Sequence, residues 1–114
     1  RRVLFRSDPT TGQVKARRAF PWPNYSGALA TAGGVVFTGT MDGTFRAVDE
    51  NTLEELWRIN LGVGFTAPPI SYAVNGKQYV LISSGLSGPA KGKLVKTPEM
   101  AEQRNATVMW VFSL

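Results

Sequence analysis

Hydrophobic and polar residues alternate along most of the chain, and no window of about eleven residues shows a convincing helical period. In EELWRINL, residues 54–61, the alternation places Trp57 and Ile59 on one side and Leu56 and Arg58 on the other. Such a pattern is typical of strands, because successive side chains of a strand point to opposite faces of the sheet. Other runs of this kind are GGVVFTGT, TFRAVDE, PISYAV, KQYVLIS and ATVMWVFSL. The pattern therefore predicts an all-β chain with about eight or nine strands.

Tight turns containing glycine separate these runs. Asn75-Gly76 is a strong hairpin signal, because both residues accept the positive φ angles of a type I′ turn. Gly33-Gly34 and Asp42-Gly43 are predicted to form two further tight turns. Residues 85–105 are polar and contain Gly, Pro and Lys, which predicts a long surface loop with one helical turn at residues 99–103.

The composition is that of a folded domain that lacks the residues of several common sites. Of the 114 residues, 43% are hydrophobic and 18% are charged, which is ordinary for a single globular domain. The absence of cysteine and histidine excludes a Cys/His zinc site and a Ser-His-Asp or Cys-His catalytic group within the chain. Its apolar runs are too short to span a membrane as a helix. The net charge of +5 comes from scattered basic residues without interleaved aromatic residues, so we expect no nucleic-acid partner.

A weak internal repeat has an offset of 41 residues. The turn sequence DPTTGQVKA begins at Asp8, and DENTLEELW begins at Asp49. A repeat of about 40 residues with four strands per unit is typical of a β-propeller, whose blades pack around a ring. In the second copy we expect Asp49 to cap the turn that follows its strand and Trp57 to pack between neighbouring blades. The alternative is a chance match between two Asp-x-x-Thr turns.

The stretch from residue 8 to about residue 85 resembles the C-terminal part of the pyrroloquinoline-quinone (PQQ)-dependent alcohol dehydrogenases, which are eight-bladed propellers. The shared pattern is LATxGGxVFxG, then AxDxxTGxxxW, then PxxYxxxGxQYV. The matching positions are Leu29, Ala30, Thr31, Gly33, Gly34, Val36, Phe37, Gly39, Ala47, Asp49, Thr52, Trp57, Pro69, Tyr72, Gly76, Gln78, Tyr79 and Val80. In the two repeat copies, Leu53 replaces the usual glycine and Ala16 the usual tryptophan. We expect these departures to strain one turn and to weaken one contact between blades.

The resemblance implies that the chain is a C-terminal fragment of about two blades with antiparallel four-stranded sheets. Residues 8–26 would end one blade, residues 27–61 would form a full blade, and residues 66–114 would form most of the last blade, with the long loop at 85–105. We interpret residues 1–7 as foreign to the domain, because RVLFRS is what a common sequencing-adapter oligonucleotide encodes in one frame. The alternative is a native strand with two arginines facing solvent. The rest of the propeller would be required to complete the ring.

The resemblance also implies which residues contact the cofactor. In the family, the segment before Leu-Ala-Thr carries an aromatic residue, a small residue and a glycine, and it runs beside the quinone near the propeller axis. The matching positions here are Tyr25, Ser26 and Gly27, preceded by Asn24. Small residues let the main chain approach a planar group closely, and polar side chains can donate hydrogen bonds to it. The alternative is that Tyr25 packs against Trp22 as part of the core.

By the same resemblance, the whole protein is expected to oxidise alcohols or sugars in the periplasm, with PQQ as the electron acceptor. Its catalytic aspartate, its cysteine pair and its Ca²⁺ or lanthanide ligands would lie outside this chain. The chain itself would therefore contain no catalytic or metal-binding residue and be inactive alone. A cytochrome c or a membrane quinone would take the electrons. Two other hypotheses stay open, namely a non-catalytic propeller acting as a scaffold or binding module, and a sandwich-type β domain.

Two remaining motifs have simpler explanations. Residues 62–67, GVGFTA, loosely match a dinucleotide-binding fingerprint, but Pro68-Pro69 exclude the helix that this motif requires. Asp42 and Asp49 can be imagined as a carboxylate pair or a metal site. Each of them precedes a turn, however, and is expected to cap it.

Overall fold

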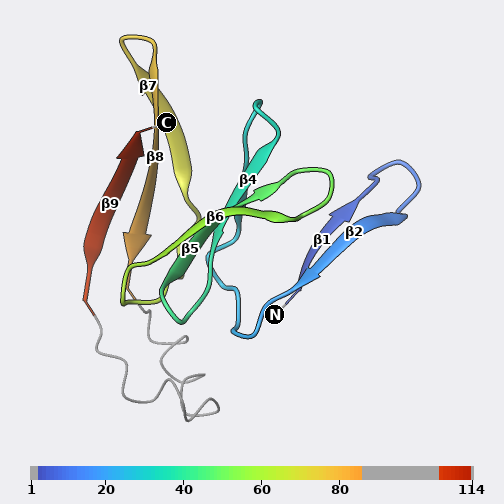
Figure 1. Ribbon diagram of the computed structural model, residues 1–114, viewed down its shortest axis with the longest axis horizontal. Coiled ribbons are helices and arrows are strands. Elements are labelled where there is room, and N and C mark those ends of the chain that lie inside the picture. Colours follow the sequence, from blue (N-terminus) through green and yellow to red (C-terminus); the bar gives the residue numbers. More distant parts are fainter. Residues whose placement is uncertain (1–2, 86–105, 114) are drawn as a thin grey trace.

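The computed structural model describes residues 3–85 and 106–113 (Figure 1). Its strands are β1 (Val3–Ser7), β2 (Val14–Ala19), β3 (Ala28–Ala30), β4 (Val35–Gly39), β5 (Thr44–Asp49), β6 (Glu55–Asn60), β7 (Ile70–Val74), β8 (Lys77–Ser84) and β9 (Val108–Ser113). The all-β prediction is confirmed for this part of the chain, which contains no helix and thus none long and apolar enough to cross a membrane. The predicted loop at 85–105, apart from Gly85, and its helical turn at 99–103 lie outside the described residues. The origin of residues 1–7 stays a prediction.

The described strands form three antiparallel sheets that lie side by side (Figure 1). β1 pairs with β2, the strands from β3 to β6 form a four-stranded sheet in chain order, and β7, β8 and β9 form the third sheet. The predicted hairpin at Asn75-Gly76 joins β7 to β8, and its φ angles of +51° and +76° are those that a type I′ turn requires. The predicted four-stranded antiparallel sheet is also present.

Within the described part of the chain, two hydrophobic cores lie between neighbouring sheets. The core between the four-stranded sheet and the third sheet contains Phe37, Phe45, Ala47, Phe65, Val80 and Ile82. The core between the β1–β2 hairpin and the four-stranded sheet contains Val36, Val48 and Leu53, with Leu4 and Ala16 packed against them. The middle sheet is therefore covered on both faces, which explains why β4 and β5 are buried along almost their whole length.

Trp57 packs between two sheets, as its place in the repeat predicts. Its ring lies 6.1 Å from the ring of Phe45 in the same sheet and 5.5 Å from that of Phe112 in β9, both measured between centroids. Both pairs have the edge-to-face geometry that aromatic rings favour. Trp57 therefore joins the four-stranded sheet to the third sheet.

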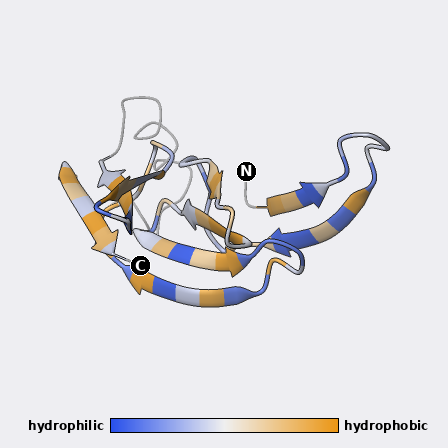
Figure 2. Cartoon of the chain, turned by 90° about the horizontal axis from the view of Figure 1, so that it is seen from above, coloured by the Kyte–Doolittle hydropathy of each residue, from blue (hydrophilic) through white to orange (hydrophobic). Residues whose placement is uncertain are grey.

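The outer sheets have exposed faces that carry hydrophobic side chains. All of β7 is exposed, and Figure 2 shows hydrophobic and hydrophilic residues alternating along strands at the edge of the molecule. The large hydrophobic residues on these sheets that remain exposed include Phe5, Val14, Ile70, Val74, Val108, Met109 and Val111. A face with this pattern normally packs against another layer of structure.

The two copies of the repeat form the same turn. The Oδ1 atom of Asp8 accepts hydrogen bonds from the main-chain N–H groups of Thr10 and Thr11, at 2.9 and 3.3 Å. In the second copy Asp49 Oδ1 accepts the equivalent bonds from Asn51 and Thr52, at 2.8 and 2.9 Å. The predicted capping role of Asp49 is confirmed, and the shared geometry favours a true repeat over a chance match.

The repeat extends into the strand that follows each turn. Ser7 pairs with Val14 while Arg6 pairs with Ala16, so that Lys15 is an extra residue that forms a β-bulge. In the second copy Val48 pairs with Glu55 while Ala47 pairs with Trp57, so that Leu56 forms the equivalent bulge. Lys15 and Leu56 are separated by the 41 residues of the repeat.

The two departures from the family pattern, Leu53 and Ala16, lie at the same hydrophobic core. Leu53 has a φ of +60°, in the left-handed region where its counterpart Gly12 has +73°. This conformation costs a leucine roughly 1–2 kcal/mol. Its side chain is nevertheless buried in the core against which Ala16 packs. The turn is therefore strained, as expected, and the burial of the leucine side chain opposes this cost.

The carboxyl group of Asp49 is expected to make the free energy of unfolding depend on pH in the acidic range. Hydrogen bonds from the N–H groups of Thr52 and Asn51 lower the pKa of the Asp49 carboxyl from 3.8. A carboxyl with a lowered pKa stabilises the fold above its unfolded pKa, and this contribution is lost as the pH falls through the folded pKa. Asp49→Asn should keep the turn, because the amide oxygen of asparagine can still accept the hydrogen bonds from the main chain. Because this side chain does not titrate, the variant should lose less stability than the unaltered protein as the pH falls. Urea unfolding at a series of pH values below 5 would test this, and an unchanged acid profile would contradict it.

Candidate functional site

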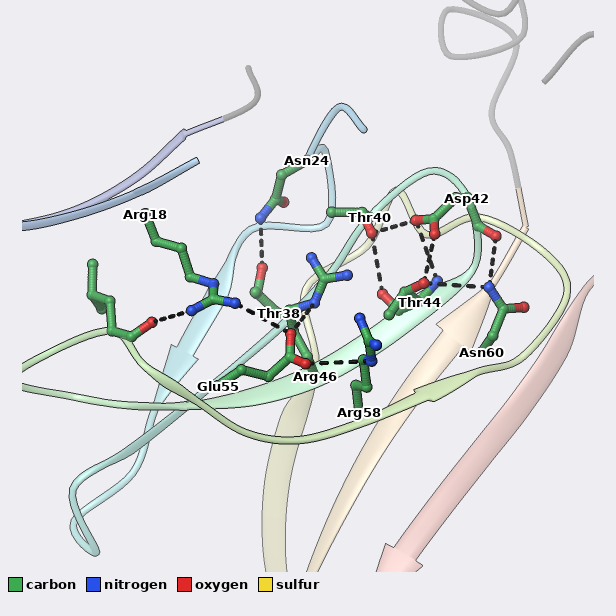
Figure 3. A network of polar contacts seen from close by, with 11 residues as sticks. Arg18, Asn24, Thr38, Thr40, Asp42, Thr44, Arg46, Glu55, Arg58 and Asn60 are labelled. Atoms are coloured by element: carbon green, nitrogen blue, oxygen red, sulfur yellow. Dashed lines mark hydrogen bonds and ion pairs between the residues drawn. The ribbon is translucent and has the colours of Figure 1, made fainter. Parts of the chain in front are cut away.

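The four candidate cofactor residues lie in the segment between β2 and β3, which runs along β4. Asn24 Nδ2 donates a hydrogen bond to Thr38 Oγ1 at 2.7 Å (Figure 3). The Thr38 hydroxyl in turn donates to the carbonyl oxygen of Gly27 at 2.6 Å. The N–H of Met41 donates to the Pro23 carbonyl oxygen at 2.9 Å. These bonds fasten both ends of the segment to the four-stranded sheet.

Ser26 directs its side chain into the protein. It is 1% exposed, and its hydroxyl oxygen accepts a hydrogen bond from the Gly39 N–H at 2.8 Å. Its hydroxyl hydrogen has the Gly39 carbonyl oxygen as its nearest acceptor, at 2.8 Å, and the Gly27 carbonyl oxygen and Asn24 Oδ1 as alternatives at 3.0 and 3.4 Å. The β3–β4 ladder stops at the pair Ala28 and Thr38, so this hydroxyl continues the bonding one residue further. The side chain of Ser26 therefore holds the segment in place.

The other three candidates line a shared hollow of about 350 Å³. Asn24, Tyr25, Gly27 and Ala28 line it together with Val3 and Leu4, which belong to the residues 1–7 that we interpret as foreign to the domain. Only the part of the wall at residues 24–28 is therefore assigned to the candidate site. Tyr25 is half-buried. Gly27 is exposed and has a φ of +80°, a conformation that glycine adopts without strain.

The hollow offers only some of the groups that a planar quinone cofactor would require. It offers an aromatic side chain, a side-chain amide and a glycine at which the main chain is accessible. The described residues that line it include no arginine or lysine, so the carboxylates of such a cofactor would need partners from other parts of the protein. Within residues 3–85 and 106–113 there is also no group of three or more acidic, histidine or cysteine side chains that could hold a metal ion.

A cluster of charges beside this segment was not predicted from the sequence. Glu55 forms ion pairs with Arg18, Arg46 and Arg58, with N–O distances of 3.5, 3.5 and 3.4 Å (Figure 3). Arg46 is only 4% exposed, and its guanidinium group lies 4.6 Å from the centroid of the Phe20 ring. Burial lowers the pKa of Arg46, whereas the charge of Glu55 opposes this change.

The bulge at Leu56 explains why sequence alternation did not reveal the cluster. Regular alternation would place Glu55 on the same face as Trp57. Because the extra residue shifts the register, Glu55 pairs with Val48 and shares a face with Arg46. The one feature of the sequence that could have indicated the cluster is the charge of Arg46, which stands in a strand that is otherwise largely hydrophobic.

Asp42 caps its turn and does not pair with Asp49. Its carboxylate accepts hydrogen bonds from the hydroxyl of Thr40 and from the hydroxyl of Thr44, the latter at 2.5 Å (Figure 3). Asp42 and Asp49 flank opposite ends of β5. The capping prediction is confirmed for both residues, and the carboxylate-pair alternative is wrong.

The arrangement of the sheets defines the class of protein. Four-stranded antiparallel sheets that pack face to face through a repeat of about 40 residues are the blades of a β-propeller. The model of the PQQ family, described as the glucose/ethanol/alcohol dehydrogenase β-propeller domain, matches residues 5–80, and the chain belongs to this family. The resemblance inferred from the sequence is thus confirmed, and the propeller replaces the sandwich-type alternative.

Individual relatives agree with this assignment. Quinoprotein ethanol dehydrogenase from Pseudomonas putida is 37% identical over 110 residues, which are 94% of this chain and 17% of that protein. A 1-butanol dehydrogenase (cytochrome c) from Thauera butanivorans is 36% identical over 107 residues, covering 94% of this chain and 15% of the relative. The solved structure of a europium-containing methanol dehydrogenase matches 98% of this chain and 23% of its own, with a TM-score of 0.85 and 28% identity. The chain therefore spans about a sixth of the length of these curated relatives.

Proposed function

We propose that this chain is a C-terminal part of a quinoprotein dehydrogenase that oxidises alcohols or sugars with PQQ as the electron acceptor. Its membership of the PQQ family and its similarity to a quinoprotein ethanol dehydrogenase support this proposal. The chain would supply about two blades of an eight-bladed ring. The exposed hydrophobic faces of β7 and β9 support the need for further blades, because such faces are stable only when they are covered.

The observation that carries the proposal is the anchored segment that holds Tyr25 beside the hollow. Asn24, Tyr25 and Gly27 would contact the quinone, and Ser26 would hold them in position. When bound, PQQ supplies the electron acceptor for oxidation of the substrate. In this chain Tyr25 would pack against the flat cofactor, and the absence of a side chain at Gly27 would let the main chain approach it.

Other parts of the whole protein would supply the remaining chemistry. The catalytic aspartate, the cysteine pair and the ligands of Ca²⁺ or a lanthanide would lie outside this chain, which would be inactive alone. The europium in the related methanol dehydrogenase supports the lanthanide alternative. A cytochrome c would accept the electrons, as the name of the Thauera relative suggests, with a membrane quinone as the alternative. The protein would act in the periplasm.

Replacement of Tyr25 tests the site. In the full-length protein, Tyr25→Ala should lower the affinity for PQQ by about tenfold, because an aromatic contact contributes roughly 0.5–1.5 kcal/mol and 1.4 kcal/mol corresponds to a factor of ten. Titration of the cofactor-free protein with PQQ, followed by tryptophan fluorescence, would measure the change. Tyr25→Phe is the matched control, because it keeps the ring and removes only the hydroxyl group.

The outcome also separates the two candidate functions. Unchanged affinity in Tyr25→Ala would remove this residue from the site. If the unaltered full-length protein did not bind PQQ, the non-catalytic scaffold or binding module would be the better description. Binding of PQQ together with a weaker Tyr25→Ala variant would support the dehydrogenase.

A further inference from the structure

We propose that Thr38 is, together with Ser26, a positioning residue that orients Tyr25 and Gly27 toward the cofactor. This inference rests on the proposed function, since it assumes that these two residues contact the quinone. Thr38 does not line the hollow and is completely buried in β4. Its effect on the cofactor would therefore be exerted through the segment that it holds.

A single hydroxyl group links both ends of the candidate segment. Thr38 Oγ1 accepts a hydrogen bond from Asn24 Nδ2 at 2.7 Å and donates one to the Gly27 carbonyl oxygen at 2.6 Å. Tyr25 lies between these two attachment points in the chain. The Thr38 hydroxyl thus closes a short loop whose tip carries the aromatic residue.

The attachment is well suited to orient a ligand-binding residue. Both partners of the Thr38 hydroxyl belong to residues that line the hollow, whereas the hydroxyl itself is shielded from water. Both bonds are part-buried, because Asn24 is half-buried and Gly27 is exposed, but the Thr38 hydroxyl between them is completely buried. Water cannot readily replace it as the link between the two residues. The main chain of Tyr25 is therefore held in one place relative to β4 before the cofactor binds, which reduces the entropy lost on binding.

Thr40 provides a matched control two residues further along the chain. It is also completely buried, but its hydroxyl donates to the carboxylate of Asp42 and not to the candidate segment. Thr38→Val and Thr40→Val therefore each remove one buried hydroxyl with almost no change of shape. Only the first of them should release the segment that carries Tyr25.

Amide hydrogen exchange tests the positioning directly and without the cofactor. The N–H groups of Gly39 and Met41 donate to Ser26 and Pro23, and so report whether the segment stays attached. In the full-length protein, Thr38→Val should raise the exchange rates of these two amides by about tenfold. The Thr40 amide, which donates within the β4–β5 turn, should be unchanged and serves as the internal reference.

Quinone affinity then connects the positioning to function. Thr38→Val should weaken PQQ binding by about five- to tenfold, whereas Thr38→Ser, which keeps the hydroxyl, and Thr40→Val should bind almost normally. If Thr38→Val does not fold, Asn24→Ala is the replacement variant, because Asn24 is half-buried and its side chain bonds to the same Thr38 hydroxyl. The exchange rates of the Gly39 and Met41 amides are then measured in Asn24→Ala. Unchanged exchange in that variant would overturn the inference.

The results distinguish this inference from the proposed function. If Tyr25→Ala weakens PQQ binding while Thr38→Val binds as well as Thr40→Val, the site stands and the positioning role of Thr38 is wrong. If Tyr25→Ala leaves the affinity unchanged, the proposed site is wrong and the inference fails with it. Weaker binding in both Tyr25→Ala and Thr38→Val, with faster exchange of the Gly39 and Met41 amides in the latter, supports both.

Discussion

Gly43→Ala should destabilise the protein by about 2–5 kcal/mol, the sum of a left-handed main-chain conformation and overpacking. Gly43 has a φ of +90°, where any side chain is strained. A Cβ atom at this position would lie 2.9 Å from the main-chain nitrogen of Val63 and 3.0 Å from that of Gly62. These are main-chain atoms, so they cannot move aside as a flexible side chain would. The Gly43 carbonyl oxygen also accepts a hydrogen bond from the Leu61 N–H, which limits any shift of the turn.

Variants of two other glycines distinguish the cost of the left-handed conformation from the cost of overpacking. Gly34 has a φ of +76° but open space around it, so Gly34→Ala should show the conformational cost of roughly 1–2 kcal/mol alone. Gly33 has open space and no positive φ, so Gly33→Ala should be close to neutral. Urea unfolding of the three variants would test the order of these effects. A loss in Gly43→Ala no larger than that in Gly34→Ala would show that the contact with residues 62–63 is unimportant.

Glu55→Ala should cost about 3 kcal/mol of stability, near the lower end of the range for breaking a buried ion pair, because Glu55 itself is partly exposed. Glu55 is the partner of three arginines, of which Arg46 is almost completely buried. Its removal would leave the buried charge of Arg46 without a paired carboxylate, with the face of the Phe20 ring and the more distant charge of Asp42 as the remaining favourable influences. Thermal or urea unfolding would measure the loss.

Two variants test whether an unpaired charge is the cause. Glu54→Ala removes the adjacent, exposed glutamate and should change stability by less than about 0.5 kcal/mol. Arg46→Met combined with Glu55→Ala removes the buried charge together with its partner, and should be more stable than Glu55→Ala alone. A double variant that is less stable than Glu55→Ala would show that Arg46 contributes mainly through its packing against Phe20.

The candidate site was only partly predictable from the sequence. The resemblance to the family identified residues 24–27, and three of these four residues line one hollow. Thr38 was missed because its role depends on two bonds to residues 14 and 11 positions earlier in the chain. The inward direction of Ser26 was missed for the same reason, since its hydroxyl is bound by Gly39 of a neighbouring strand.

The all-β class, the hairpin at Asn75-Gly76, the capped repeat turns and the family could all be predicted from the residues alone. These features depend on contacts within a few residues or on a pattern repeated along the chain, and both can be recognised locally. The burial of Leu53, the grouping of three arginines around Glu55, and the attachment of the Tyr25 segment to Thr38 became visible only in the folded arrangement of the strands. These features escape local patterns because a single bulge reverses the face of a side chain, and because a buried polar group takes its partner from the strand that packs beside it.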